Sequence, residues 1–156
     1  MISAPVDAPD FCEAFARTVA RAGHAPALRS SDGTVRLSWR EFDTRMRAVA
    51  GGLADLGVGP GGTVAMLLTN RFEAAVVDMA TLHLGAVPVS LYNSAPAGQL
   101  TYLFSDSRAD VVVTERAFAE RVGQALDAVA PGSIPQLVGC VMNKLGVDIA
   151  HWNRES

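Results

Sequence analysis

The chain has 156 residues, a formal net charge of −3 at pH 7 and 49% hydrophobic side chains, with a mean hydropathy of +0.22. This length predicts one domain with a hydrophobic core of its own. The absence of a basic run argues against nucleic-acid binding. The apolar composition is typical of strands buried on both faces, or of a piece that has lost a covering partner.

The sequence carries no targeting or membrane signal that we recognise. Residues 1–5 lack the charged segment and apolar core of a secretory signal. The longest apolar stretch, residues 74–91, is interrupted by Asp78, His83 and Pro88, so no transmembrane segment is predicted. We therefore expect a cytoplasmic protein.

The N-terminal region predicts a helix followed by a hairpin. Asp10 can accept hydrogen bonds from the first backbone N–H groups of a helix that ends at Gly23. Residues 27–31 and 34–37 flank Asp32-Gly33, which is a strong signal for a tight turn between two antiparallel strands.

The next segment predicts a well-marked helix. Ser38 and Glu41 have the spacing of a capping box, in which each side chain bonds the backbone of the other residue. Asp43 and Arg47 can form an ion pair one turn apart. The apolar positions recur at helical spacing and stop at residue 56: Phe42, Met46, Val49, Leu53 and Leu56.

Residues 57–62, Gly-Val-Gly-Pro-Gly-Gly, match the dinucleotide-binding pattern G-x-G-x-x-G. That pattern carries its mechanism only when the glycines follow a strand and open a helix. Here a helix precedes the glycines and residues 63–68 predict a strand after them. We therefore interpret Gly57 as the end of a helix and the other glycines as a turn.

The rest of the chain alternates helices with apolar strands. Asn70 is the expected N-cap of a helix that Gly85 ends, and Pro96 opens another that runs to about Ser105. A long helix is expected over residues 115–129, and short strands over residues 87–91, 110–114 and 136–141. This alternation predicts an α/β fold with a parallel, doubly wound sheet and flanking helices.

Residue spacing alone reveals no active site. His83 lies on an apolar helical stripe and is expected to pack, while His24 and His151 have no partner at a useful spacing. Cys12 and Cys140 lack the spacing of a metal site and are expected to be reduced core thiols. A hydroxyl-rich run at residues 30–34 resembles a phosphate loop, but Asp32 would repel phosphate and no lysine follows.

Two ordered blocks resemble the N-terminal part of AMP-forming acyl-CoA synthetases, members of the adenylate-forming superfamily. The resemblance runs from about Pro26 to about Glu115 and fades beyond about Ser133. Residues 91–96, with Gln99 and Tyr102, are most similar to the long-chain fatty acid branch. The blocks are LSWREFDTRMRAVAGGLADLGVGPGGTVAMLLTN and LHLGAVPVSLYNSAPAGQLTYLFSDSRADVVVTE.

The resemblance implies a two-step reaction. A fatty acid carboxylate attacks ATP to give an acyl-adenylate and pyrophosphate, and the thiol of coenzyme A then displaces AMP. In full-length members this implies ATP, magnesium and coenzyme A, together with a mobile C-terminal domain that supplies a catalytic lysine.

This chain departs from the family pattern. It lacks the phosphate loop with its lysine, the Tyr-Gly-x-Thr-Glu-like segment, the ribose-binding aspartate and the C-terminal lysine. Lys144 has none of the surrounding sequence, and Gly62 stands where an acidic residue is common. We therefore expect no cofactor for this chain alone, and we assign no catalytic, cofactor-binding or metal-binding residue.

We expect residues 1–133 to form a partial N-terminal domain of an acyl-CoA synthetase, and residues 134–156 to be a divergent tail of unknown role. The expected function is that of an N-terminal fragment of a long-chain fatty acid–CoA ligase, inactive alone. Its expected partner is the missing remainder of a synthetase or another synthetase chain.

Other readings of the sequence stay open. The chain could be a stand-alone binding or regulatory module that pairs with a complete synthetase, or a nucleotide-binding α/β domain that uses its glycines. A truncated gene product, a frameshifted tail or a shortened expressed chain would each account for the missing motifs.

Overall fold

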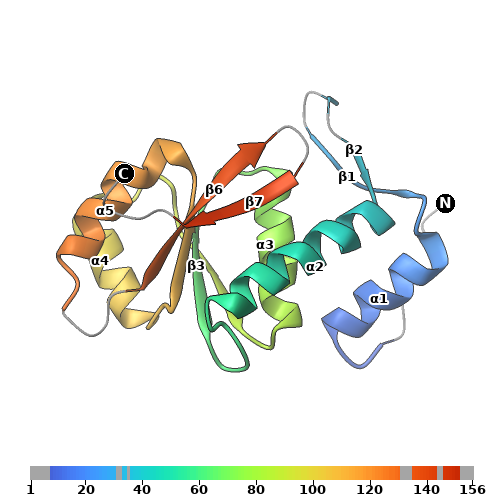
Figure 1. Cartoon of the computed structure of the whole chain (residues 1–156), viewed down its shortest axis with the longest axis horizontal. Helices are drawn as coiled ribbons and strands as arrows, with labels where there is room; N and C mark the ends of the chain where they lie inside the picture. The colour runs from blue at the N-terminus through green and yellow to red at the C-terminus, as the bar shows by residue number, and fades with distance from the viewer. Residues whose placement is uncertain (1–7, 31–32, 35, 131–134, 144–145, 152–156) are drawn as a thin grey trace.

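The computed structural model describes residues 8–30, 33–34, 36–130, 135–143 and 146–151, and from residue 136 onward it describes the backbone only. Figure 1 shows a central sheet with helices on both faces. The sheet has the strand order β4-β3-β5-β6-β7. The strands span Thr63–Leu67 (β3), Val87–Ser90 (β4), Val111–Thr114 (β5), Gln136–Asn143 (β6) and Gly146–His151 (β7).

The predicted parallel sheet is confirmed. Strands β4, β3, β5 and β6 run parallel to one another. Strand β7 was not predicted, and it pairs antiparallel with β6 over six residue pairs, from Val138 with His151 to Asn143 with Gly146. Val147 and Ile149 alternate with Gly146 and Asp148, but this short pattern does not specify a partner strand. The place of β7 in the sheet is therefore set by its pairing with β6.

Helices cover the two faces of the sheet in two groups. Alternate residues of β3 point to opposite faces, with Val64 and Met66 in one hydrophobic cluster and Ala65 and Leu67 in the other. Helices α1, α2 and α3 pack in the first cluster, and α4 and α5 pack in the second. The helices span Phe11–Ala22 (α1), Trp39–Asp55 (α2), Phe72–His83 (α3), Ala97–Asp106 (α4) and Ala119–Asp127 (α5).

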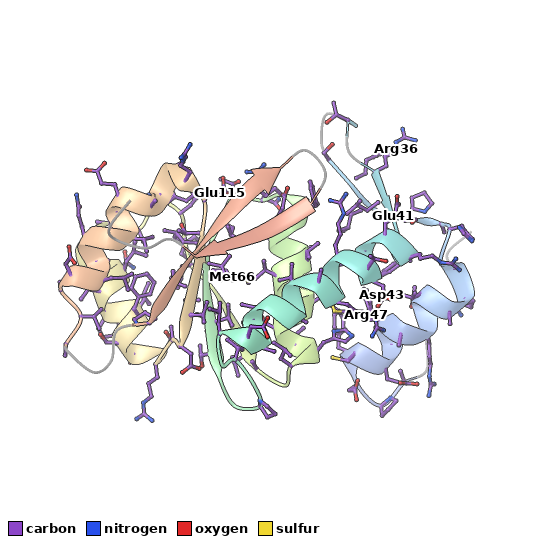
Figure 2. All side chains as sticks on the ribbon, viewed as in Figure 1. Arg36, Glu41, Asp43, Arg47, Met66 and Glu115 are labelled. Atoms are coloured by element: carbon purple, nitrogen blue, oxygen red, sulfur yellow. The ribbon has the colours of Figure 1, made fainter. Side chains whose placement is uncertain are left out.

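The predicted helix starts at Asp10 and Ser38 are confirmed. Asp10 Oδ1 accepts a hydrogen bond from the backbone N–H of Glu13 at 2.8 Å. Ser38 Oγ accepts from the N–H of Glu41 at 3.3 Å, and Glu41 Oε2 accepts from the N–H of Ser38 at 2.8 Å. Both ends of the capping box are therefore formed, and Figure 2 shows Glu41 at the start of α2.

The N-terminal hairpin is formed by β1 (Pro26–Arg29) and β2 (Arg36–Ser38), which pair antiparallel. Gly33 has a φ of +72°, which suits the predicted tight turn, whereas Asp32 lies outside the described residues. The two-stranded hairpin is a sheet of its own beside the larger one (Figure 1).

Two predicted helix boundaries are wrong. The N-cap of α3 is Arg71 rather than Asn70, and it makes no side-chain capping bond, because a guanidinium has no acceptor for a backbone N–H. Its side chain forms ion pairs across the sheet edge instead. The helix expected over residues 115–129 begins as a separate 3-10 turn, η1 (Arg116–Phe118), before α5. That break allows Phe118 to pack against the second hydrophobic cluster.

Gly57 ends α2 as predicted. Its φ is +89°, a conformation that costs glycine little. The N–H of Gly57 donates to Ala54 O at 2.9 Å, and the N–H of Val58 donates to Leu53 O at 3.0 Å. These two bonds define a Schellman motif, which turns the chain sharply from α2 toward β3.

Candidate site at the carboxyl edge of the sheet

The order in which the chain adds strands to the sheet reverses between β3 and β5. Helix α3 connects β3 to β4 on one side, whereas α5 connects β5 to β6 on the other. In doubly wound sheets, ligands bind outside the carboxyl ends of the strands at such a switch point. We therefore take the residues that directly follow β3 and β5 as the candidate site.

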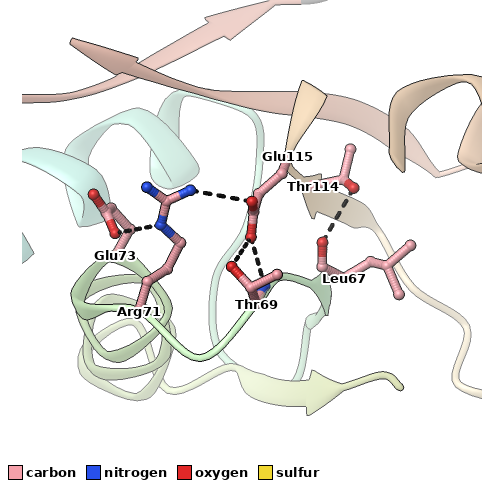
Figure 3. Close-up of polar contacts among 6 residues, drawn as sticks. All are labelled: Leu67, Thr69, Arg71, Glu73, Thr114 and Glu115. Carbon is pink, nitrogen blue, oxygen red and sulfur yellow. Dashed lines mark hydrogen bonds and ion pairs between the residues drawn. The ribbon is translucent and has the colours of Figure 1, made fainter. Parts of the chain in front are cut away.

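Four polar side chains meet at this point (Figure 3). The carboxylate of Glu115 accepts hydrogen bonds from the backbone N–H of Thr69 at 2.5 Å and from its hydroxyl at 2.6 Å. Arg71 Nη1 donates to Glu115 Oε2 at 3.1 Å. Arg71 Nε lies 3.1 Å from Glu73 Oε2. One guanidinium thus bridges a carboxylate at the end of β5 and another in the first turn of α3.

The cluster of Thr69, Arg71, Glu73 and Glu115 is largely removed from solvent. The side chain of Glu73 is 4% exposed, that of Glu115 is 13% exposed and that of Arg71 is 32% exposed. The Glu73–Arg71 contact is an ion pair without hydrogen-bond geometry, and Glu73 Oε2 has no hydrogen-bond partner among the residues whose side chains the structure describes. With two carboxylates around one guanidinium, the cluster carries a formal charge of −1.

Burial raises the pKa of Glu115, but hydrogen bonds and charge act in the opposite direction. The hydroxyl and the backbone N–H of Thr69, followed by the charge and hydrogen bond of Arg71, together outweigh burial and hold the pKa of Glu115 below its usual value. Glu115 is therefore a stable anion, which suits a structural acceptor better than a general acid near neutral pH.

The contacts of the cluster suit a structural role, in which paired charges hold two parts of the fold together. Arg71 has charged partners on α3 and after β5, so the guanidinium that could bind a phosphate is already paired. Thr114, the last residue of β5, also donates its hydroxyl to Leu67 O at 3.1 Å. These contacts hold the ends of β3 and β5 together.

Sequence reasoning missed this cluster because its members are far apart in the chain. Thr69 and Glu115 are separated by 46 positions, and no spacing rule relates them. A usable signal was present, since polar residues directly follow both buried strands, and the carboxyl ends of adjacent parallel strands lie side by side.

The glycines at 57–62 lie at the opposite edge of the sheet. They precede β3, so they stand at the amino ends of the strands. The N–H of Gly61 donates to Gly85 O at 3.0 Å, and the N–H of Val87 donates to Gly62 O at 2.8 Å. The helix–glycine–strand order is confirmed, and the glycine loop serves to join the starts of β3 and β4.

The structure places His83 in a packing role. Its Nδ1 lies 2.8 Å from Met79 O, and its ring meets the Phe15 ring edge-on at a centroid distance of 5.4 Å. His24 is exposed. His151 is described only as backbone at the end of β7. Of the two histidines whose side chains are described, neither contacts the carboxyl-edge cluster.

The remaining candidates from the sequence also lie away from the cluster or outside the description. Cys12 is a free thiol that is half-buried rather than fully in the core; burial and, secondly, Asp10 raise its pKa. Cys140 is described as backbone within β6, and Lys144 lies outside the described residues. Among the described residues, no three His, Cys, Asp or Glu side chains gather closely enough to hold a metal ion.

Comparison with known protein families identifies the family of this chain. The family profile described as AMP-binding enzyme matches residues 15–148, from α1 into β7. The chain belongs to the AMP-binding enzyme family. In its described residues, no helix is both long and apolar enough to cross a membrane.

Two curated relatives and one solved structure illustrate the similarity. The uncharacterised protein Rv1549 of Mycobacterium tuberculosis is 42% identical over 111 residues, which are 71% of this chain and 63% of that protein. The long-chain-fatty-acid–CoA ligase FadD15 of Mycobacterium bovis is 38% identical over 98 residues, which are 62% of this chain and 16% of the ligase. A benzoate CoA ligase from Burkholderia xenovorans superposes with a TM-score of 0.75 at 21% identity, over 87% of this chain and 26% of its own.

These coverages define how the chain relates to its family. It matches part of each of these relatives, from about three fifths of the short protein Rv1549 to about one sixth of FadD15. The benzoate CoA ligase confirms the fold. The predicted resemblance to adenylate-forming synthetases is therefore confirmed, and this chain corresponds to a partial region of the longer enzymes.

Proposed function

We propose that this chain is an N-terminal portion of a long-chain fatty acid–CoA ligase and forms no acyl-adenylate by itself. The observation that carries this proposal is the match to FadD15, which extends over 62% of this chain but only 16% of the ligase. In this proposal residues 1–133 are a partial N-terminal domain and residues 134–156 are a divergent tail. The proposed location is the cytoplasm.

Physical chemistry supports the lack of independent activity. Adenylate formation builds negative charge on the phosphates, which enzymes offset with positioned donors and metal ions. At the carboxyl edge of this sheet the guanidinium of Arg71 is already paired with Glu73 and Glu115. We propose that ATP, magnesium and coenzyme A are bound by the remainder of a synthetase, either the missing part or another chain.

The test is palmitate-dependent exchange of labelled pyrophosphate into ATP in the presence of magnesium. The purified chain is assayed alone and together with a separately expressed remainder of a related synthetase. We expect exchange only in the mixture. Exchange by the chain alone would contradict the proposal.

A second candidate function is a binding or regulatory module that pairs with a complete synthetase. The observation that favours it is Rv1549, a short relative of which this chain matches 63%. Addition of the chain to a complete synthetase would then change the exchange rate of that enzyme at saturating ATP. A ligase fragment that only completes a missing part would leave the complete enzyme unchanged.

A further inference from the structure

The hairpin of β6 and β7 extends past the carboxyl end of β5. Residues Gln136–Gly139 of β6 pair with β5, whereas residues 140–143 pair only with residues 146–149 of β7. Four strand residues reach about 13 Å at the usual rise per residue. We call residues 140–143 and 146–149 the arm.

The arm lies across the carboxyl edge of the sheet. Strand β6 contacts η1, which directly follows Glu115, and β7 contacts α2. Figure 3 shows the two strands running over Arg71, Glu73 and Glu115, and Figure 1 shows the same hairpin directed toward α2 and α3. The hairpin of β6 and β7, to which the arm belongs, therefore spans from the residues after β5 to the helix layer that flanks α3.

The charged cluster is buried although it lies at the edge of the sheet. Loops at the edge of a sheet are normally hydrated, yet the side chains of Glu73 and Glu115 are only 4% and 13% exposed. A buried carboxylate oxygen that has no hydrogen bond to the described residues, as at Glu73 Oε2, loses hydration at a cost. A segment that excludes water from the edge accounts for both observations.

We infer that the arm is an intramolecular cover which closes the carboxyl edge at the switch point between β3 and β5. A ligand or partner chain that engages this edge must first displace the arm. The inference gives the tail a role, and it stands whether or not the chain is part of a ligase, because it rests only on the position of the arm and the burial of the cluster.

The experiment opens the arm and measures access to the carboxylates. In the full chain, Val147→Pro combined with Asp148→Pro removes two successive backbone N–H groups of β7, one of which faces β6 in an antiparallel pair. Carboxylates are labelled with a water-soluble carbodiimide and glycine ethyl ester and then quantified by mass spectrometry. Glu41, which is exposed in the capping box, is the internal reference.

We expect labelling of Glu73 and Glu115 to rise about tenfold or more relative to Glu41 when the arm is opened, because local opening sets access to buried groups. A second pair of variants tests the same point by truncation. A chain that ends after Gly139 lacks the arm, and its matched control ends after His151 and keeps it.

Slow amide hydrogen exchange in β3 and β5 serves as the measure of folding. Unchanged labelling of Glu73 and Glu115 in variants that keep this protection would overturn the inference. Loss of protection in both the proline variant and the truncated chain would also overturn it, because a segment that the core needs in order to fold is not a displaceable cover.

Discussion

The carboxylate of Asp110 accepts a hydrogen bond from the backbone N–H of Thr63 at 2.8 Å, and the N–H of Asp110 donates to Thr63 O at 2.9 Å. This reciprocal pair ties the start of β5 to the start of β3. A Cβ atom at Gly62 would lie 2.9 Å from Asp110 Oδ2 and 3.1 Å from Gly59 O. The glycine that departs from the acidic residue expected in the family is thus the residue that leaves room for Asp110.

Replacing this glycine by the acid expected in the family should destabilise the protein. We expect Gly62→Asp to lower the free energy of unfolding by about 1–3 kcal/mol, because the new side chain overpacks the turn and places a second carboxylate beside Asp110. Denaturant unfolding midpoints measure the change. Gly59→Ala is the matched control, since a Cβ atom there meets nothing within 4 Å.

The same pair allows a double-mutant test. If crowding against Asp110 causes the loss of stability, Gly62→Asp should lower the free energy of unfolding by less in an Asp110→Ser background than in the natural chain. Equal costs in the two backgrounds would assign the effect to Gly59 O and the turn backbone instead.

The capping box predicts that Ser38→Ala lowers the stability of the protein by an amount that depends on pH. Removal of the hydroxyl should lower the free energy of unfolding by about 1 kcal/mol at neutral pH. Hydrogen bonds from the backbone and then the side chain of Ser38 lower the pKa of Glu41. The stability from ionised Glu41 is present above its unfolded pKa and is lost as pH falls through the folded pKa, so the difference between the two proteins should shrink in acid. A difference that stays constant at acid pH would argue against this coupling.

Two glycines of the same segment should respond to alanine with opposite signs. At Gly57 the φ of +89° makes a side chain unfavourable, and we expect Gly57→Ala to cost about 1 kcal/mol. Gly51 lies within α2, and a Cβ there meets nothing within 4 Å. Gly51→Ala should therefore stabilise by up to about 1 kcal/mol. The melting temperatures of the two variants, compared with that of the natural chain, test this prediction. A lower melting temperature for both variants would contradict it.

Arg108 offers a stabilising change at another helix end. It follows α4 with a φ of +50°, and the N–H groups of Arg108 and Ala109 close the helix by bonding to Ser105 O and Phe104 O. Because glycine adopts this conformation without a Cβ penalty, Arg108→Gly should raise the free energy of unfolding by about 0.5–1 kcal/mol. Arg108→Ala is the control, since it removes the charge but keeps the Cβ atom, and it should leave the melting temperature nearly unchanged.

The carboxyl-edge cluster predicts a pH dependence with a defined sign. The pKa of Glu115 is lowered from its usual value of 4.5, so its contribution is present above that value and is lost as pH falls through the folded pKa. Glu115→Gln should cost about 2 kcal/mol at neutral pH, because charge-assisted bonds from Thr69 and Arg71 are lost. Unfolding midpoints across acid pH should converge for the two proteins, and parallel pH profiles would contradict the assignment.

Asp78 should show the opposite pH dependence, because its pKa is raised whereas that of Glu115 is lowered. Burial raises the pKa of Asp78 above the usual value of 3.8, so the neutral form is favoured in the folded state. The stability from neutral Asp78 is present below the unfolded pKa and is lost as pH rises through the folded pKa. The free energy of unfolding of Asp78→Asn, relative to that of the natural chain, should therefore increase as pH rises. The relative free energy of unfolding of Glu115→Gln should decrease over the same range.

The local elements were readable from the sequence because their causes are local. Asp10 and the Ser38–Glu41 box start helices through bonds that span three residues, and Gly57 ends one through its own φ. The helix–glycine–strand order was enough to set aside the nucleotide-loop pattern. Ordered sequence blocks also indicated the family, which the match over residues 15–148 confirmed.

What only the tertiary structure decided depends on contacts between distant residues. Arg71 rather than Asn70 is the N-cap of α3, and the strand order places Arg71 beside Glu115, 44 positions away. Asp110 takes up the space at Gly62 because β5 lies next to β3. Strand β7 joins the sheet because the exposed edge of β6 offers unpaired backbone groups, and no residue pattern in Gly146–His151 specifies that partner. Strand order, set by packing across the whole sheet, is therefore what assembled the charged cluster and the arm that covers it.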